Sequence, residues 1–304
     1  MRSERALCER ITFDLLFRWF LDMTPDEACF DHSDFTNFRA RLDRRDVTKK
    51  FSDKIVQMAF GHGLISEEHF SIDGSLLQSH ASLKSLKHIE EIARAAADRT
   101  RNDERKDSDQ GKSGGGLSAS TPAVTPRSDS NAWVDFRSQR RGNATHRSVV
   151  DPEARLYTKT DGVAYLQHSM HVLMENRNGI GADICVGEAD GYAERACGLK
   201  MLDRVKRKLN LAPTTLGADK GYDTEDFLPA LEERGIEPHL ACKSQDEIKV
   251  PCEEDEGKMA RWRNQHRQRE KYCHVSQKKR KLNEEIFGWL KQFGGLRRAR
   301  VVGR

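Results

Sequence analysis

The chain has 304 residues, of which 33% are charged and 37% are hydrophobic. This length can bury the core of one large domain or two smaller ones, and the mean hydropathy of −0.77 excludes a polytopic membrane protein. The most apolar stretch near the start, residues 15–21, contains Arg18 and is too short for a membrane span or a signal-peptide core. We therefore expect a cytoplasmic, nucleoid-associated protein without a membrane partner.

The net charge of +4 conceals an asymmetry between the two ends of the chain. Residues 261–304 contain 14 Lys and Arg but only three Asp and Glu, which gives this segment a charge of +11. The rest of the chain is therefore mildly acidic. A strongly basic segment of this kind is typical of proteins that bind a polyanion, most often nucleic acid, and a solvated basic tail is the plainer alternative.

Residues 1–66 are predicted to form a small helical domain. Leu7, Ile11 and Leu15 recur at helical spacing, and Thr24-Pro25-Asp26-Glu27 has the pattern of a capping box that begins a helix. A cap at Ser33 and an amphipathic segment at 47–60 predict further helices, with arginines between them. Such a bundle is as typical of packing domains as of DNA-binding domains, so both roles remain open.

A short buried strand is predicted at residues 69–75, and it ends in Asp73-Gly74. A long insertion, residues 84–142, follows this strand. Within it, residues 89–105 are predicted to form a charged, alanine-rich helix. Residues 107–131 are rich in Ser, Gly, Asp and Pro, which predicts a flexible linker.

From about Thr145 the chain alternates between apolar and polar residues, which predicts strands. The expected elements are strands at 155–160, 163–175 and 180–189, a helix at 193–209, a strand at 214–219, a helix at 224–234, a strand at 236–241 and a helix at 276–293. This order predicts an α/β fold with a ribonuclease H-like mixed sheet and flanking helices. We expect residues 67–304 to form this domain.

Two of the expected strands end in an aspartate followed closely by a glycine, at Asp73 and at Asp219. If the strands are neighbours in the sheet, both carboxylates emerge at the same edge and repel each other unless a divalent cation lies between them. Carboxylate oxygens suit magnesium or manganese. The alternative is that each Asp-Gly pair only forms a turn.

The last predicted helix places Arg280, Glu284 and Lys291 on one face, because steps of four and eleven residues return to nearly the same angle. Leu282, Ile286, Trp289 and Phe293 would form the opposite, apolar face that packs on the sheet. Glu284 would thus supply a third carboxylate, flanked by cations that could hold phosphates. A surface helix with an ordinary Arg280–Glu284 ion pair is the alternative.

These residues lie within longer motifs. They are Leu15-Leu16-Phe17-Arg18-Trp19-Phe20, Ser71-Ile72-Asp73-Gly74-Ser75-Leu76, Asp151-Pro152-Glu153-Ala154-Arg155-Leu156, His171-Val172-Leu173-Met174-Glu175-Asn176-Arg177, Ala193-Glu194-Arg195, Gly217-Ala218-Asp219-Lys220-Gly221-Tyr222-Asp223 and Arg280-Lys281-Leu282-Asn283-Glu284-Glu285-Ile286-Phe287-Gly288-Trp289-Leu290-Lys291. With them the chain resembles bacterial insertion-sequence transposases of the DDE class, in the broad group around insertion sequences four and five. The family pattern Y-x2-R-x3-E-x6-K is matched at Arg280, Glu284 and Lys291, whereas Gln277 stands where the family has tyrosine.

The resemblance implies an enzyme that cuts insertion-sequence ends and joins their 3′-hydroxyls to target DNA by metal-dependent phosphoryl transfer. It implies that Asp73, Asp219 and Glu284 are the catalytic residues and bind two Mg²⁺ ions, which Mn²⁺ could replace. Arg280 and Lys291 would bind phosphates, and Lys220 and Lys278 would strengthen the hold on DNA. The implied partners are the terminal inverted repeats, the target DNA and a second copy of the chain in the synaptic complex.

Other readings remain beside this one. The family usually has more chain before the first helix and after the last, so a truncated, catalytically inactive copy that only binds DNA is the second hypothesis. A nuclease that cuts without joining ends is the third. A zinc site could be assembled from Cys242, Cys252, His266, Cys273 and His274, although their spacings match no standard zinc pattern.

Overall fold

The computed structural model describes residues 4–107, 133–136, 138–158, 163–243, 250–252, 254–269 and 271–299. The chain divides into two units, Met1–Ile65 and Ser66–Arg304. Among the described residues, every helix is too short or too polar to cross a lipid bilayer.

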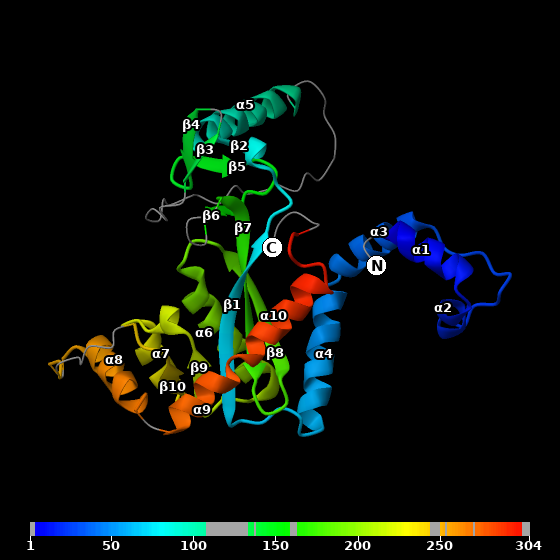
Figure 1. The fold of residues 1–304 in the computed structure, drawn as a ribbon. Helices are drawn as coiled ribbons and strands as arrows, with labels where there is room; N and C mark the ends of the chain where they lie inside the picture. The colour runs from blue at the N-terminus through cyan, green and yellow to red at the C-terminus, as the bar shows by residue number, and fades with distance from the viewer. Residues whose placement is uncertain are drawn as a thin grey trace. The chain divides into compact units, whose positions relative to one another are not determined.

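Four helices form the first unit (Figure 1): α1 (Glu4–Phe13), α2 (Leu15–Phe20), α3 (His32–Asp43) and α4 (Val47–Gly61). The helix expected to begin at Thr24 is absent from this described segment, where Pro25, Asp26 and Glu27 form a turn and bend. The cause is Arg18, whose buried guanidinium donates hydrogen bonds to the carbonyls of Thr24 and Glu27. These carbonyls would otherwise accept the first bonds of a helix.

A mixed sheet forms the centre of the second unit (Figure 1). Its strands are β1 (His69–Gln78), β6 (Arg155–Tyr157), β7 (Tyr165–Glu175), β8 (Ile180–Glu188), β9 (Thr215–Ala218) and β10 (Glu237–Leu240). The order is β10-β9-β1-β7-β6, and β8 also pairs with β7. The three strands β1, β9 and β10 are parallel, whereas β7 is antiparallel to β1, β6 and β8.

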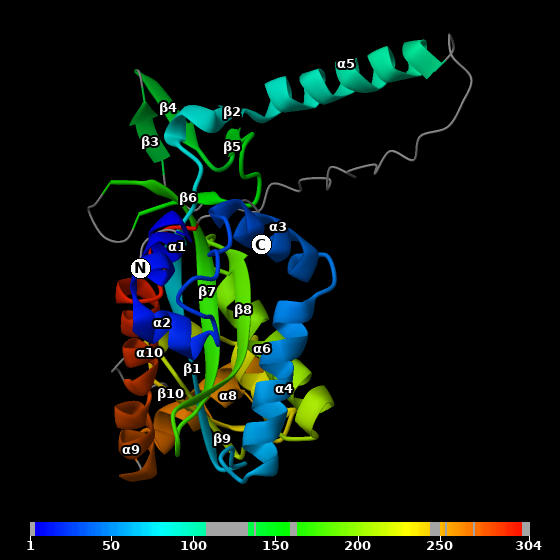
Figure 2. The ribbon, with the colours of Figure 1, turned by 90° about the vertical axis from the view of Figure 1, so that its right-hand side faces the viewer.

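Helices cover both faces of this sheet. On one face, α6 (Ala193–Leu209) packs so closely that a Cβ at Gly198 would lie 3.0 Å from Cδ1 of Ile72, and α7 (Phe227–Glu232) follows β9 in the chain. On the other face lie α9 (Lys271–Lys279) and α10 (Leu282–Gln292), where Phe287 packs with Met170 and Val172. Figure 2 shows α6 and α10 on opposite sides of β1 and β7. Mixed α/β architecture with flanking helices is confirmed.

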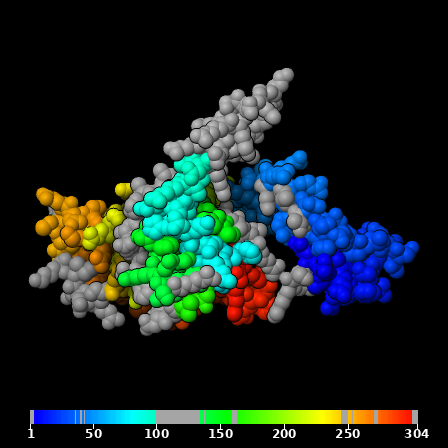
Figure 3. Space-filling model, turned by 90° about the horizontal axis from the view of Figure 1, so that it is seen from above, coloured from blue at the N-terminus to red at the C-terminus, as the bar shows by residue number. Residues whose placement is uncertain are grey.

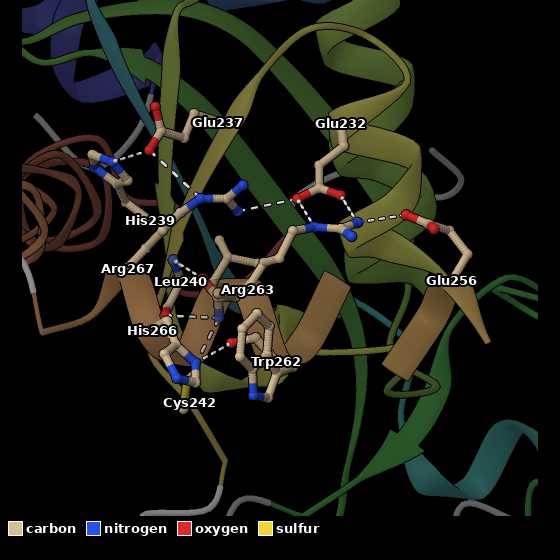
Figure 4. A network of polar contacts seen from close by, with 11 residues as sticks. Glu232, Glu237, His239, Leu240, Cys242, Glu256, Trp262, Arg263, His266 and Arg267 are labelled. Carbon is tan, nitrogen blue, oxygen red and sulfur yellow. Dashed lines mark hydrogen bonds and ion pairs between the residues drawn. The ribbon is translucent and has the colours of Figure 1, made fainter. Parts of the chain in front are cut away.

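The polar stretch between β10 and α9 contains a helix that the sequence pattern did not predict, α8 (Glu256–Arg267). Ion pairs hold it in place (Figure 4). Arg263 lies 2.5 Å from both Glu232 of α7 and Glu256, and Arg267 lies 3.0 Å from Glu232. Helix α8 is attached by charged contacts and has no regular apolar stripe. That stripe is the pattern by which a helix is recognised in a sequence.

The ends of the expected insertion contain regular structure. They comprise η1 (Leu83–Ser85), β2 (Leu86–His88), α5 (Ile89–Asp107), β3 (Trp133–Phe136), β4 (Gln139–Gly142) and β5 (His146–Ser148). The strands form two small sheets, β2–β5 and β3–β4, and Figure 3 shows their cyan and green residues gathered side by side. The helix predicted at 89–105 is confirmed, whereas nearly all of the linker predicted at 107–131 lies outside the described residues.

The helix predicted at 276–293 is divided into α9 and α10 by a turn at Arg280 and Lys281. There the N–H groups of Lys281 and Asn283 donate to carbonyls three residues earlier, at 3.3 and 3.0 Å. The predicted apolar face is wrong, because Trp289 is 60% exposed and Phe293 is 75% exposed. The sheet-facing side carries the buried residues Asn283 and Phe287 instead.

The packing of α6 on β1 predicts a large stability effect at Ile72. Ile72→Ala removes a fully buried side chain in β1, so we expect the free energy of unfolding to fall by about 2–5 kcal/mol. Ile184→Ala in β8 is the matched control, since Ile184 is 51% exposed and its loss should cost about 1 kcal/mol or less. Denaturant midpoints measure both, and equal losses would contradict the assigned core.

A buried histidine in β7 predicts acid sensitivity. Burial lowers the pKa of His171 to about 4 from the ordinary value of 6.5, against a raising effect of Asp190. Below pH 6.5 the unfolded chain binds a proton at His171, whereas the folded chain binds it only near pH 4. The free energy of unfolding therefore falls between about pH 6.5 and pH 4. The loss should reach about 3 kcal/mol.

His171→Leu should make the urea midpoint depend less steeply on pH between pH 7 and pH 4.5 without abolishing the dependence, because burial also lowers the pKa of His69 in β1 to about 4. His274→Leu, which replaces an exposed histidine in α9, is the control for losing any histidine. Identical pH profiles for the parent and His171→Leu would exclude His171 as the source.

Candidate active site

Asp73 lies within β1, where β7 pairs on one side and β9 on the other. Its Oδ1 accepts a hydrogen bond from the N–H of Gly74 at 2.8 Å, and its Oδ2 lies 3.3 Å from Nη1 of Arg280. Burial raises the pKa of Asp73, and the charges of Asp219 and Glu284 add to this effect against those two contacts. Burial and neighbouring negative charge therefore both disfavour the ionised form of Asp73.

The strand register brings Asp219 to the level of Asp73. Phe70 pairs with Leu216 and Ser71 with Gly217 in the parallel β1–β9 ladder, and two more residues along each strand lead to the two aspartates. Asp219 directly follows β9 and caps the short helix η2 (Lys220–Tyr222) by accepting the N–H of Gly221 at 2.8 Å. The two carboxylates thus stand at neighbouring strand positions.

Glu284 lies in the first turn of α10 and is exposed. It is near enough to Asp73 for its charge to raise the pKa of that carboxyl. The competing acid Glu285 is also exposed. The fold thus brings Glu284 toward Asp73, and Arg280 lies in the turn that joins α9 to this helix.

Arg280 and Lys291 both reach β1, two residues apart on the same strand. Arg280 pairs with Asp73, and Nζ of Lys291 donates to Oγ of Ser75 at 2.5 Å. By contrast, Lys220 and Lys278 are exposed, and within the described part of the chain neither side chain contacts the three carboxylates. Of the four cations expected to hold DNA, Arg280 and Lys291 therefore contact β1, whereas Lys220 and Lys278 lie at the surface.

Gln277 has a definite structural role at the position where the resemblance expects tyrosine. Its Nε2 donates to the carbonyl of Ala218 at 3.1 Å and to the carbonyl of His239 at 2.5 Å. Ala218 is the last residue of β9 and His239 the last but one of β10, so Gln277 ties α9 to the strand end that precedes Asp219. An amide can donate to both strands at once, which a phenol cannot.

Two further residues belong to this region and were not selected from the sequence. Glu194 begins α6, and the charges of Asp219 and Asp73 raise its pKa in addition to burial. Tyr222 ends η2, and its buried hydroxyl has no hydrogen-bond partner among the described residues. Both lie inside the quoted motifs, but only the fold brings α6 to η2.

The chemistry of the donors fits a divalent metal, although the side chains are not arranged around one. Among the described residues, no three His, Cys, Asp or Glu side chains are already placed as a metal ligand set. Asp73, Asp219 and Glu284 supply only carboxylate oxygens, the ligands that Mg²⁺ and Mn²⁺ prefer. Burial, together with the charges of Asp219 and Glu284, raises the pKa of Asp73, and a bound cation would favour its ionised form.

The cysteines and histidines weighed for zinc make other contacts. Cys242 accepts a hydrogen bond from Asn264 at 3.5 Å, and the ring of His266 stacks on Trp262 at a centroid distance of 4.0 Å (Figure 4). Cys273 is buried, whereas Cys252 and His274 are exposed.

Comparison with known proteins adds two matches to this geometry. Residues 134–303 match the family model described as Transposase DDE domain, and residues 1–41 match that described as Transposase domain (DUF772). Searches of curated proteins and of solved structures find no match. The first model spans more than half of the chain and includes Asp219, Arg280, Glu284 and Lys291. The chain therefore belongs to the transposase DDE domain family.

Proposed function

We propose that this chain is a DNA transposase that cuts the ends of an insertion sequence and joins the freed 3′-hydroxyls to target DNA. The observation that carries the proposal is the parallel β1–β9 register, which sets Asp73 and Asp219 level with each other. The charge of Glu284 acts on the same Asp73 carboxyl. Membership of the transposase DDE domain family supports the reaction class.

A ribonuclease H-like fold is part of this proposal. The support is the sequence of elements in the second unit, in which the antiparallel strands β1, β7 and β8 precede α6, β9, α7 and β10. In such a sheet the central parallel pair carries functional side chains at its exit edge. Here that pair is β1 and β9.

Asp73, Asp219 and Glu284 would hold two Mg²⁺ ions, which Mn²⁺ could replace. When bound, the ions would lower the pKa of the attacking hydroxyl and neutralise charge on the phosphate and the leaving oxygen. The protein holds Asp73 in place through the Gly74 N–H and Arg280, and Asp219 through the Gly221 N–H. These bonds fix carboxylate orientation before DNA arrives.

DNA would be held by cations at two distances from the carboxylates. Arg280 and Lys291 lie at Asp73 and Ser75 and would bind phosphates beside the cut. Lys220 and Lys278 are exposed and would contact the backbone farther away. The helical unit 1–65, with exposed Arg41 and Arg44 on α3 and the turn after it, would bind terminal repeats, and synapsis of two ends would require a homodimer.

Removal of any one of the three carboxylates should abolish metal-dependent cleavage. In Asp73→Asn, Asp219→Asn and Glu284→Gln, we expect Mg²⁺-dependent cutting of a terminal-repeat duplex to fall by about a thousandfold or more, since several kcal/mol of charge stabilisation disappear. Duplex binding, measured by gel shift, should survive. Glu285→Gln is the matched control and should cut within about threefold of the parent.

Full cutting by the three single variants would reject the carboxylate trio. A parent protein that binds terminal repeats but neither cuts nor joins them would instead identify an inactive, DNA-binding copy. Cutting without joining would identify a nuclease.

The surface lysines should determine the salt dependence of DNA binding. For Lys220→Ala and Lys278→Ala, we expect the slope of log K against log salt to decrease by about one each, with similar weakening for every DNA sequence. Lys258→Ala is the control, because Lys258 is exposed but paired with Asp255 in α8. Unchanged slopes for the first two variants would remove them from the DNA interface.

A further inference from the structure

The first turn of α6 is anchored over the sheet edge that carries the aspartates. Asp190 accepts hydrogen bonds from the N–H groups of Tyr192 and Ala193, both at 2.8 Å, and so caps the start of the helix. One turn later, Cys197 and Gly198 are buried, with Gly198 against Ile72 of β1. Glu194, between these two fixed points, is therefore held by the fold and does not extend freely into solvent.

Glu194 and Asp219 converge on Gly221. A Cβ built on Gly221 would lie 2.9 Å from Oδ1 of Asp219 and 3.2 Å from Oε2 of Glu194. In addition, Nη1 of Arg195 approaches the carbonyl of Gly221 at 3.4 Å. The first turn of α6 thus contacts η2. Oδ1 of Asp219 and Oε2 of Glu194 border the space beside Gly221, where glycine has no side chain.

The electrostatic surroundings of Glu194 agree with this geometry. Burial raises the pKa of Glu194, and the charges of Asp219 and Asp73 raise it further, while Arg195 acts in the opposite direction. Arg195 itself lies over the ring of Tyr192, 5.6 Å from its centroid. Arg195 therefore divides its contacts between Glu194, the Tyr192 ring and the Gly221 carbonyl.

Tyr222 provides a second, independent sign of a missing ligand. Its side chain is only 1% exposed and its ring packs on Phe227, with centroids 5.2 Å apart. The hydroxyl has no hydrogen-bond partner among the described residues, yet it lies close enough to Glu194, Asp73 and Asp219 for all three charges to raise its pKa. Buried hydroxyls without partners are rare because they cost free energy.

We propose that Glu194, from the α6 side of the sheet, is a fourth carboxylate of the metal site beside Asp73 and Asp219, and that the Tyr222 hydroxyl donates a hydrogen bond into the filled site. The ligand is a hard divalent cation such as Mg²⁺ or Mn²⁺. This assignment rests on the proposed function, because it extends the same site. It also gives a role to Gly221, where a Cβ would press on the Asp219 oxygen and crowd that of Glu194.

The test measures metal binding and stability without DNA. Mn²⁺ binding, followed by the loss of the free-ion signal in electron paramagnetic resonance, is compared for Glu194→Gln, Tyr222→Phe, Asp219→Asn and Glu285→Gln. We expect Glu194→Gln to weaken binding about tenfold or more and Tyr222→Phe to weaken it severalfold. Asp219→Asn should weaken it strongly, and the exposed control Glu285→Gln should bind like the parent.

Thermal unfolding without metal supplies a second readout, which does not depend on metal binding. Without metal, Glu194→Gln should raise the melting temperature by about 2–4 °C, because it removes a charge from a repelling group, and the further rise on adding MgCl₂ should shrink. A Glu194→Gln protein that binds Mn²⁺ like the parent, while Asp219→Asn does not, would overturn this inference alone. Unchanged binding in Asp219→Asn as well would overturn the proposed metal site.

Discussion

The crowding of partly buried carboxylates where β9 ends beside β1 is the constraint on which the candidate site depends. Parallel pairing sets Asp73 and Asp219 level with each other, and burial keeps water from screening their charges fully. The fold answers with fixed donors, namely the N–H groups of Gly74 and Gly221 and the guanidinium of Arg280. These donors orient the carboxylates, yet burial and the charges of Asp219 and Glu284 still raise the pKa of Asp73.

A polar seam across the sheet holds the helices that complete this edge. Ser276 of α9 hydrogen-bonds with His69 at 2.9 Å, and Asn283 of α10 donates to Oγ of Ser71 at 3.0 Å. Ser71 in turn donates to Asn176 at 2.8 Å, in the turn that joins β7 and β8. Hydrogen bonds between buried polar groups require one alignment, whereas apolar contacts tolerate sliding. The seam therefore fixes where α10 carries Glu284.

Those parts of the molecule that follow a simple period could be predicted from the sequence. The alternation at β7 and β8 and the long helices α5 and α6 lie within one or two residues of their expected ranges. The break before α10 and the exposure of Trp289 were missed, because Asn283, a polar residue, occupies the sheet-facing position. Helix α8 was missed for a related reason, since Arg263 and Arg267 attach it through ion pairs.

The candidate site, too, could be predicted only in part from the sequence. Asp73 and Asp219 could be selected because each follows apolar strand residues and has a glycine close behind it, and they were expected to meet if their strands were neighbours. The predicted strand end at Asp73 is wrong, because β1 continues to Gln78. Glu194 could not be selected, since an acid in the first turn of a helix is ordinary, and its approach to Gly221 depends on how α6 crosses the sheet. The role of Gln277 was likewise hidden, because its two acceptors lie on different strands.

The end of β1 has a consequence for how the protein is made. Gln78 pairs with the backbone on either side of Arg298, through an N–H bond to the carbonyl of Arg297 at 3.1 Å and a bond from the N–H of Ala299 at 2.7 Å. The earlier part of β1 pairs with β7 and β9, which are both synthesised after it. During synthesis on the ribosome this central strand therefore emerges long before its neighbours, and its last partner leaves the exit tunnel only when translation has passed Ala299. The pairing of β1 is thus complete only after Ala299 has been synthesised, and contacts between segments so far apart in the chain slow the folding of a sheet.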